Sequence, residues 1–132
     1  MRIAQIRSPL TDLENELMRA VWDHGPCSVE GVHRVISANR SLKEGTTRTL
    51  LRRLEQKGYL RHEEKDRAYI YSAVDPARSL AAKAARQLID RFCNGSLEQL
   101  LVGMVENKVV DRAELQELAR KIARKTRKGD DL

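Results

Sequence analysis

Residues 46–58, TTRTLLRRLEQKG, carry leucines at a spacing that predicts an α-helix with two unlike faces. At about 100° per residue, the stripe expected to face a core is about 100° wide and holds Thr47, Leu50, Leu51 and Leu54. The opposite face is polar and holds Gly45, Thr49, Arg52 and Gln56, with Arg48 and Arg53 on its flanks and Thr46 at its edge. Gly58 is the expected left-handed terminator, so we expect a helix over residues 44–57 with its polar face exposed.

The polar face of this helix has the side chains that read a DNA major groove. Arginine can hold guanine through two parallel hydrogen bonds, glutamine can do the same with adenine, and threonine offers a hydroxyl or a methyl group. The amide groups of the first turn add donors for phosphate. The alternative is a face that is merely hydrated, and the neighbouring segments decide between the two.

Two helices are expected before this one. Residues 11–25 begin with a capping box formed by Thr11 and Glu14, which satisfies backbone donors at the start of a helix. Ser28 is a good N-cap for a second helix that ends near residue 40. The second and third helices would then be joined by a short turn, as in a helix-turn-helix pair.

A β-hairpin is expected after Gly58. Residues 59–64 (YLRHEE) and 68–74 (AYIYSAV) are short segments rich in residues that favour strands. Lys65 and Arg67 lie at the tip between them, where they are expected to reach phosphate or a minor groove; the alternative is a turn that is merely hydrated. Three helices and a hairpin within about 65 residues are the layout of a winged helix-turn-helix domain.

The chain is therefore expected to be mainly α with a small β-hairpin and to have two domains. Asp75-Pro76 marks the boundary between a winged helix-turn-helix DNA-binding domain, residues 1–76, and a helical dimerisation domain, residues 77–132. Three amphipathic helices are expected in the second domain, and a partner chain is the expected cover for their apolar stripes. The alternative is that these helices fold back on the first domain. The residues expected to form the dimer contact are Leu80, Leu88, Phe92, Leu100, Leu101 and Leu118.

Charge and composition limit the kinds of function. The net charge is +6, divided as +2 over residues 1–76 and +4 over residues 77–132, so a DNA-binding surface must be a local patch rather than a basic tail. That patch is expected to comprise Thr46, Arg48, Thr49, Arg52, Arg53, Lys65 and Arg67. The chain lacks a catalytic triad, a paired-carboxylate motif and a glycine-rich phosphate loop, so we expect neither an enzyme nor a cofactor.

Membrane insertion and secretion are not expected. The chain has no run of about 18 apolar residues, and residues 1–10, MRIAQIRSPL, lack the apolar centre of a signal peptide. Its two cysteines do not form a disulfide framework. A reducing cytoplasm is the expected location.

Three stretches resemble the bacterial penicillinase-repressor family. They are residues 10–36 (LTDLENELMRAVWDHGPCSVEGVHRVI), 45–60 (GTTRTLLRRLEQKGYL) and 67–74 (RAYIYSAV), within a likeness that runs from Leu10 to Leu118. The resemblance implies a dimeric transcriptional repressor whose winged helix binds one half of a near-palindromic operator in double-stranded DNA. Its implied contacts are Thr46, Arg48 and Thr49, with Arg53 and the wing in support; Gly45 stands where relatives often carry a lysine.

The resemblance also implies a regulatory protease as a partner. In the family, a membrane sensor-protease for β-lactams triggers cutting in the fifth helix, typically at an Asn-Phe bond. The matching position here is Gly103-Met104, so the expected bond is absent. A copper-responsive branch carries a cysteine-rich tail, whereas residues 125–132 (KTRKGDDL) contain no cysteine, so that metal site is not expected.

The sequence is also compatible with two alternative functions, a metal- or redox-responsive regulator and a protein-interaction module. A metal- or redox-responsive winged-helix regulator could use His24, Cys27 and His33, but their spacing is not a standard zinc motif and a fourth ligand is not apparent. A Cys27–Cys93 redox pair would have to join two predicted domains. A winged-helix protein-interaction module would use residues 44–57 against another protein, and it would lack the steep salt dependence of DNA binding.

Overall fold

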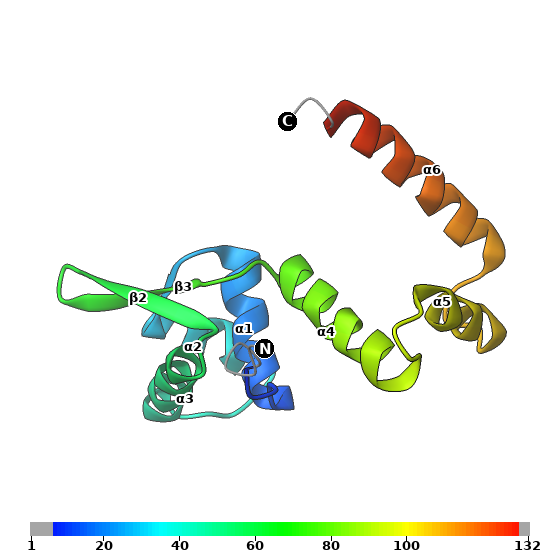
Figure 1. Ribbon diagram of the computed structural model, residues 1–132. Coiled ribbons are helices and arrows are strands. Elements are labelled where there is room, and N and C mark those ends of the chain that lie inside the picture. The colour runs from blue at the N-terminus through cyan, green and yellow to red at the C-terminus, as the bar shows by residue number, and fades with distance from the viewer. Residues whose placement is uncertain (1–6, 130–132) are drawn as a thin grey trace. The chain divides into compact units, whose positions relative to one another are not determined.

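The computed structural model describes residues 7–129, except for the side chains of residues 127–129. It divides into two compact units, with the boundary between Ala81 and Ala82. The elements, labelled in Figure 1, are α1 (Asp12–His24), β1 (Cys27–Ser28), α2 (Val29–Ser37), α3 (Glu44–Gln56), β2 (Leu60–Lys65), β3 (Ala68–Ala73), α4 (Ala77–Phe92), α5 (Leu97–Glu106) and α6 (Arg112–Gly129). The statements about residues 1–6 and 130–132 made from the sequence lie outside the described residues. Among the residues that are described, no helix has the length and apolar character needed to cross a membrane.

The predicted starts of α1 and α2 are confirmed. The Thr11 hydroxyl accepts the amide of Glu14 at 3.1 Å, and the Glu14 carboxylate accepts the amide of Thr11 at 3.0 Å, which completes the capping box. The hydroxyl of Ser28 accepts the amide of Gly31 at 3.0 Å. Gly58, with φ of 92°, lies in the left-handed conformation after α3. These local signals mark where α1 and α2 begin and where α3 ends.

The sheet has three antiparallel strands in the order β1-β3-β2. The hairpin of β2 and β3 was predicted, but the two-residue strand β1 was not. Cys27 and Ser28 of β1 pair with Tyr71 and Ile70 of β3. So short a strand has no periodicity of its own, and only the partner strand reveals it.

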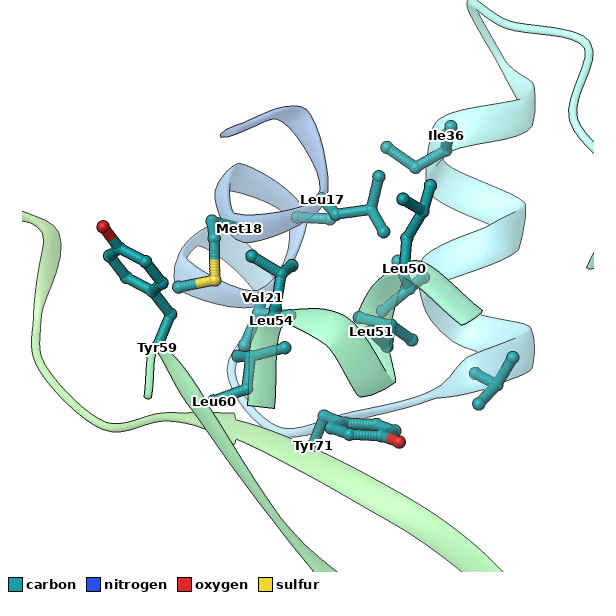
Figure 2. Close-up of a cluster of buried hydrophobic side chains, with 13 residues drawn as sticks. Leu17, Met18, Val21, Ile36, Leu50, Leu51, Leu54, Tyr59, Leu60 and Tyr71 are labelled. Carbon is teal, nitrogen blue, oxygen red and sulfur yellow. The ribbon is translucent and has the colours of Figure 1, made fainter. Parts of the chain in front are cut away.

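The core of the first unit lies between the three helices and the sheet. The four residues predicted for the inner stripe of α3, Thr47, Leu50, Leu51 and Leu54, are all buried. Figure 2 shows Leu17 and Val21 of α1 meeting the leucines of α3, with Tyr71 of β3 beside them. This packing turns the opposite, polar face of α3 outward.

Two polar groups complete the core contacts. The hydroxyl of buried Thr47 lies 3.2 Å from Nδ1 of His33, which links α2 to α3. The indole Nε1 of Trp22 donates to the carbonyl of Asp75 at 3.1 Å and ties α1 to the segment after β3. A buried donor or acceptor needs such a partner, because leaving it unpaired costs about 1–3 kcal/mol.

The second unit is formed by helices that bury little of their apolar surface. Asn94 and Gly95, with φ of 54° and 83°, follow α4, and the Ser96 hydroxyl accepts the amide of Gln99 at 3.2 Å. Ile89 is the one buried hydrophobic side chain among the described residues of α4 to α6. Large apolar side chains that remain exposed in this unit are Leu88, Phe92, Leu97, Val102, Val109, Leu118 and Ile122.

Candidate nucleic-acid interface

The polar face of α3 is free of the rest of the first unit. All five α3 residues predicted to contact DNA are exposed: Thr46, Arg48, Thr49, Arg52 and Arg53. Gly45 and Gln56 on the same face are exposed as well. The buried leucine stripe packs against the core, so this face is open to solvent.

A groove lies between α3 and the hairpin. It has a volume of about 390 Å³, and Arg48 and Arg52 of α3 face it together with Arg67 of the hairpin turn. The remaining lining comes from the end of β1, the start of α2, the first residue of α3 and the strand β3, namely Ser28, Val29, Glu30, Glu44, Ala68, Tyr69 and Tyr71. The fold thus brings together three of the seven cationic and polar residues chosen from the sequence.

The other four predicted residues lie outside this groove. Thr46, Thr49 and Arg53 lie on the exposed surface of α3, and Lys65 ends β2 next to the turn. Lys65 pairs across the hairpin with Ala68. All four are exposed and belong to the same unit as the groove.

The arginines differ in whether they are already paired. The guanidinium of Arg48 lies 3.4 Å from the carboxylate of Glu44, one turn earlier in α3, with both side chains nearly half exposed. Within residues 7–129, no ion pair forms at Arg52, Arg53 or Arg67. Cations without an internal partner are available for an external anion.

The geometry of Thr49 narrows what this residue can offer. Its hydroxyl donates to the carbonyl of Gly45 at 3.0 Å within α3. With the proton used in the helix, the side chain presents its methyl group and the lone pairs of its oxygen. Thr49 therefore suits a thymine methyl or a base amino group better than a base acceptor.

A chain of contacts behind the groove was not found from the sequence. Nδ1 of His62 on β2 lies 2.7 and 2.8 Å from the two carboxylate oxygens of Glu55 on α3. The His62 ring stacks on Tyr69, with centroids 4.0 Å apart and planes 14° apart. These contacts connect the last turn of α3 to both strands of the hairpin through residues that belong to three different elements.

Tyr71 lies at the inner end of the same region. Burial raises the pKa of its hydroxyl, and the carboxylate of Glu55 acts in the same direction, while Arg52 and Arg48 oppose it. The phenol therefore stays protonated at neutral pH and can act as a hydrogen-bond donor.

The residues considered for a metal or redox site have other contacts. Within the described part of the chain, no three His, Cys, Asp or Glu side chains form a group that could hold a metal ion. Sγ of Cys27 donates to the carbonyl of Gly25 at 3.0 Å, and burial raises the pKa of this thiol. His33 contacts Thr47 and Ser37. A raised thiol pKa makes Cys27 less reactive, which argues against a redox role.

Comparison with known proteins identifies the family. Residues 10–124 match the family model described as the penicillinase repressor. The chain belongs to the penicillinase repressor family. Among its relatives, the penicillinase repressor of Bacillus licheniformis is 28% identical over 110 residues, which cover 83% of this chain and 85% of the relative. The methicillin resistance regulatory protein MecI of Staphylococcus aureus is 22% identical over 109 residues, covering 83% of this chain and 89% of MecI.

A solved structure of this family is also similar. It is the solution structure of the monomeric form of Bacillus licheniformis BlaI in complex with the blaP half-operator. The likeness covers 53% of this chain and 87% of that one, with 28% identity and a TM-score of 0.47. Membership of the penicillinase repressor family confirms the predicted class, a DNA-binding transcriptional repressor with a winged helix and not an enzyme.

Proposed function

We propose that this penicillinase repressor family member represses transcription in the cytoplasm as a homodimer bound to a near-palindromic operator. In the proposal, residues 1–76 form the DNA-binding domain and residues 77–132 the dimerisation domain. Each protomer places α3 in a major groove and the β2–β3 hairpin beside it. The observation that carries the proposal is the groove where Arg48, Arg52 and Arg67 converge beside an exposed polar helix face.

The proposed contacts divide into two kinds. Thr46, Arg48 and Thr49, in the first turns of α3, read base edges. Their types match that role, because arginine holds guanine and threonine contacts thymine or an amino group. Cations further along the helix and on the hairpin bind phosphates and fix the register of the protein on the duplex. These cations are Arg52, Arg53, Lys65 and Arg67.

The apolar surface of the second unit supports dimerisation. Leu88 is 49% exposed, Phe92 74% and Leu118 42%, while Leu100 and Leu101 are half-buried. Exposed apolar area of this kind favours cover by another chain. Two-fold pairing would place two reading helices about one DNA turn apart, roughly 34–36 Å. Leu80, which was also predicted to contact the partner chain, differs from the other five residues because it packs against the core of the first unit.

Cleavage by a regulatory protease between Gly103 and Met104 is the candidate route for relieving repression. Both residues lie inside α5, a helix without a fully buried residue. A glycine within a helix weakens it by about 1 kcal/mol relative to alanine, which favours the local opening that a protease needs. Mass spectrometry of the chain recovered from β-lactam-treated cells tests this route. A fragment ending at Gly103 would support cleavage as the route to derepression, whereas intact chain in derepressed cells would rule it out.

The DNA-binding part is tested with full-length Arg48→Ala and Thr49→Ala variants. The probe is a duplex of about 30 base pairs that the wild-type chain enriches from a randomised pool. Loss of a good base contact should weaken binding by about tenfold or more for Arg48→Ala. Arg19→Ala is the matched control, since Arg19 forms a similar exposed ion pair with Asp23 on α1.

The outcomes separate the competing functions. Unchanged binding by both α3 variants would remove α3 as the reading helix. A wild-type chain without duplex affinity at low salt would favour a protein-interaction module instead. A steep loss of affinity as salt rises supports contact with phosphates.

A further inference from the structure

The first turn of α3 brings a carboxylate to the groove. Glu44, the first residue of the helix, lines the groove together with Arg48, Arg52 and Arg67. Its side chain is 44% exposed. A negative charge on a surface proposed to meet phosphates opposes binding. Glu30 at the start of α2 also lines the groove, but Glu44 is the carboxylate that belongs to the reading helix itself.

The ion pair that Glu44 forms with Arg48 is long and exposed. The guanidinium of Arg48 is 3.4 Å away, which is long for an ion pair, and both side chains are open to solvent. The next residue, Gly45, carries no side chain, and a Cβ at that position would meet nothing within 4 Å. The first turn therefore has space in front of it and a carboxylate beside that space.

A carboxylate in this place acts differently on different duplexes. It repels the phosphates of any DNA that approaches α3, and this repulsion is independent of sequence. It can also accept a hydrogen bond from the amino group of cytosine, which stands at the major-groove edge. Only a duplex with that base in the right position compensates the repulsion.

We propose that Glu44 is a specificity-determining residue, whose carboxylate weakens binding to DNA in general and is matched by a cytosine amino group in the operator. The proposal rests on the DNA-reading role of α3 proposed above. Its effect is on the ratio between operator and non-operator affinity.

A purely structural role would leave that ratio unchanged. An acidic residue in the first turn stabilises a helix through the helix dipole, and a Glu-to-Arg pair four residues apart adds a little more. Replacement of Glu44 would then lower the melting temperature and change binding to both duplexes alike.

The test compares full-length wild type, Glu44→Gln and Asp23→Asn. Asp23 forms an exposed ion pair with Arg19 on α1, so Asp23→Asn changes the net charge equally and lies away from the groove. Binding is measured by fluorescence anisotropy, over a series of KCl concentrations, to the duplex enriched by the wild type and to a shuffled duplex of the same composition. Melting temperatures are measured on the same samples.

We expect Glu44→Gln to bind the shuffled duplex about three- to tenfold more tightly while its affinity for the enriched duplex rises less or falls. Repeating the enrichment with Glu44→Gln should relax the preference for cytosine at one position of each half-site. An unchanged affinity ratio in Glu44→Gln, or an equal change in Asp23→Asn, would overturn the proposal. A wild-type chain that enriches no sequence would instead overturn the DNA-reading role of α3, and this proposal with it.

Discussion

The carboxylate of Glu14 lies 2.7 Å from Nζ of Lys57, and this ion pair joins the first turn of α1 to the residue that follows α3. Glu14 is 1% exposed, whereas the Lys57 side chain is 20% exposed. Lys57 also donates to the carbonyl of Pro9 at 3.1 Å. The end of α3 is therefore anchored to α1 by an ion pair. Neither residue of this pair belongs to the exposed polar face that is proposed to read DNA.

The Glu14→Gln variant should lose stability in a pH-dependent way. Burial alone would raise the pKa of Glu14, but hydrogen bonds from Lys57 and Thr11 outweigh it and hold the pKa below its ordinary value of 4.5. The stabilisation is therefore complete above about pH 4.5 and is lost as the pH falls through the folded-state value. At pH 7 the substitution should cost about 2–3 kcal/mol in urea unfolding.

The difference between wild type and Glu14→Gln should shrink at pH values below 4. Glu16→Gln is the control, because Glu16 pairs with Arg40 on the surface and should have little effect at pH 7. Equal losses for Glu14→Gln at pH 7 and pH 3 would show that the packing of the side chain, and not its charge, stabilises α1 against α3.

Local signals explain what the sequence could predict. The capping residues Thr11 and Ser28, the terminator Gly58 and the leucine spacing of α3 act over one or two helical turns. The helix ends and the apolar helix face that these signals produce can therefore be predicted without knowledge of the rest of the fold. The outward direction of the α3 polar face followed from the same spacing.

Contacts between different secondary-structure elements explain what could not be predicted. Lys57 meets Glu14 and His62 meets Glu55 because helices and strands pack in three dimensions. Charged residues at such positions look like ordinary surface residues in a linear pattern. Glu44 was likewise placed in the groove only once the hairpin and α3 were positioned together.

Substitutions in the hairpin turn should change the stability of the fold and the affinity for DNA in different directions. Asp66 and Arg67 have φ of 53° and 66°, the left-handed conformation that a type I′ turn requires and glycine adopts most easily. Arg67→Gly should therefore raise stability by about 0.5–1 kcal/mol. It should also weaken binding to the enriched duplex, because it removes a cation from the groove.

Asp66→Gly is the matched substitution for this turn. Asp66 also has a positive φ, so a glycine there should raise stability. The substitution removes a negative charge, so DNA affinity should rise or stay the same. Thermal unfolding and anisotropy measured on both variants give the comparison. Equal DNA affinities of the two glycine variants would argue against a contact between Arg67 and DNA.

The two halves of the Thr49 side chain can be tested separately. Because the hydroxyl donates to Gly45 within the helix, the methyl group is expected to make the contact with DNA. Thr49→Val keeps the methyl group and should retain binding within about twofold, whereas Thr49→Ser loses it and should weaken binding about fourfold, the equivalent of one buried carbon group. The opposite order would mean that the hydroxyl leaves Gly45 to contact a base.

Phe92 provides the sharpest test of the homodimer. Among the described residues of the second unit it is the most exposed large apolar side chain, and Leu88 lies one turn before it on the same face of α4. In a two-fold interface each substitution occurs twice, so Phe92→Glu should weaken dimerisation about a hundredfold or more. Sedimentation velocity should then show a monomer at micromolar concentration, and the affinity for the enriched duplex should fall with it. Gln87→Glu, which adds the same charge about 140° around the helix, should remain dimeric; a dimeric Phe92→Glu variant would place the contact between protomers elsewhere.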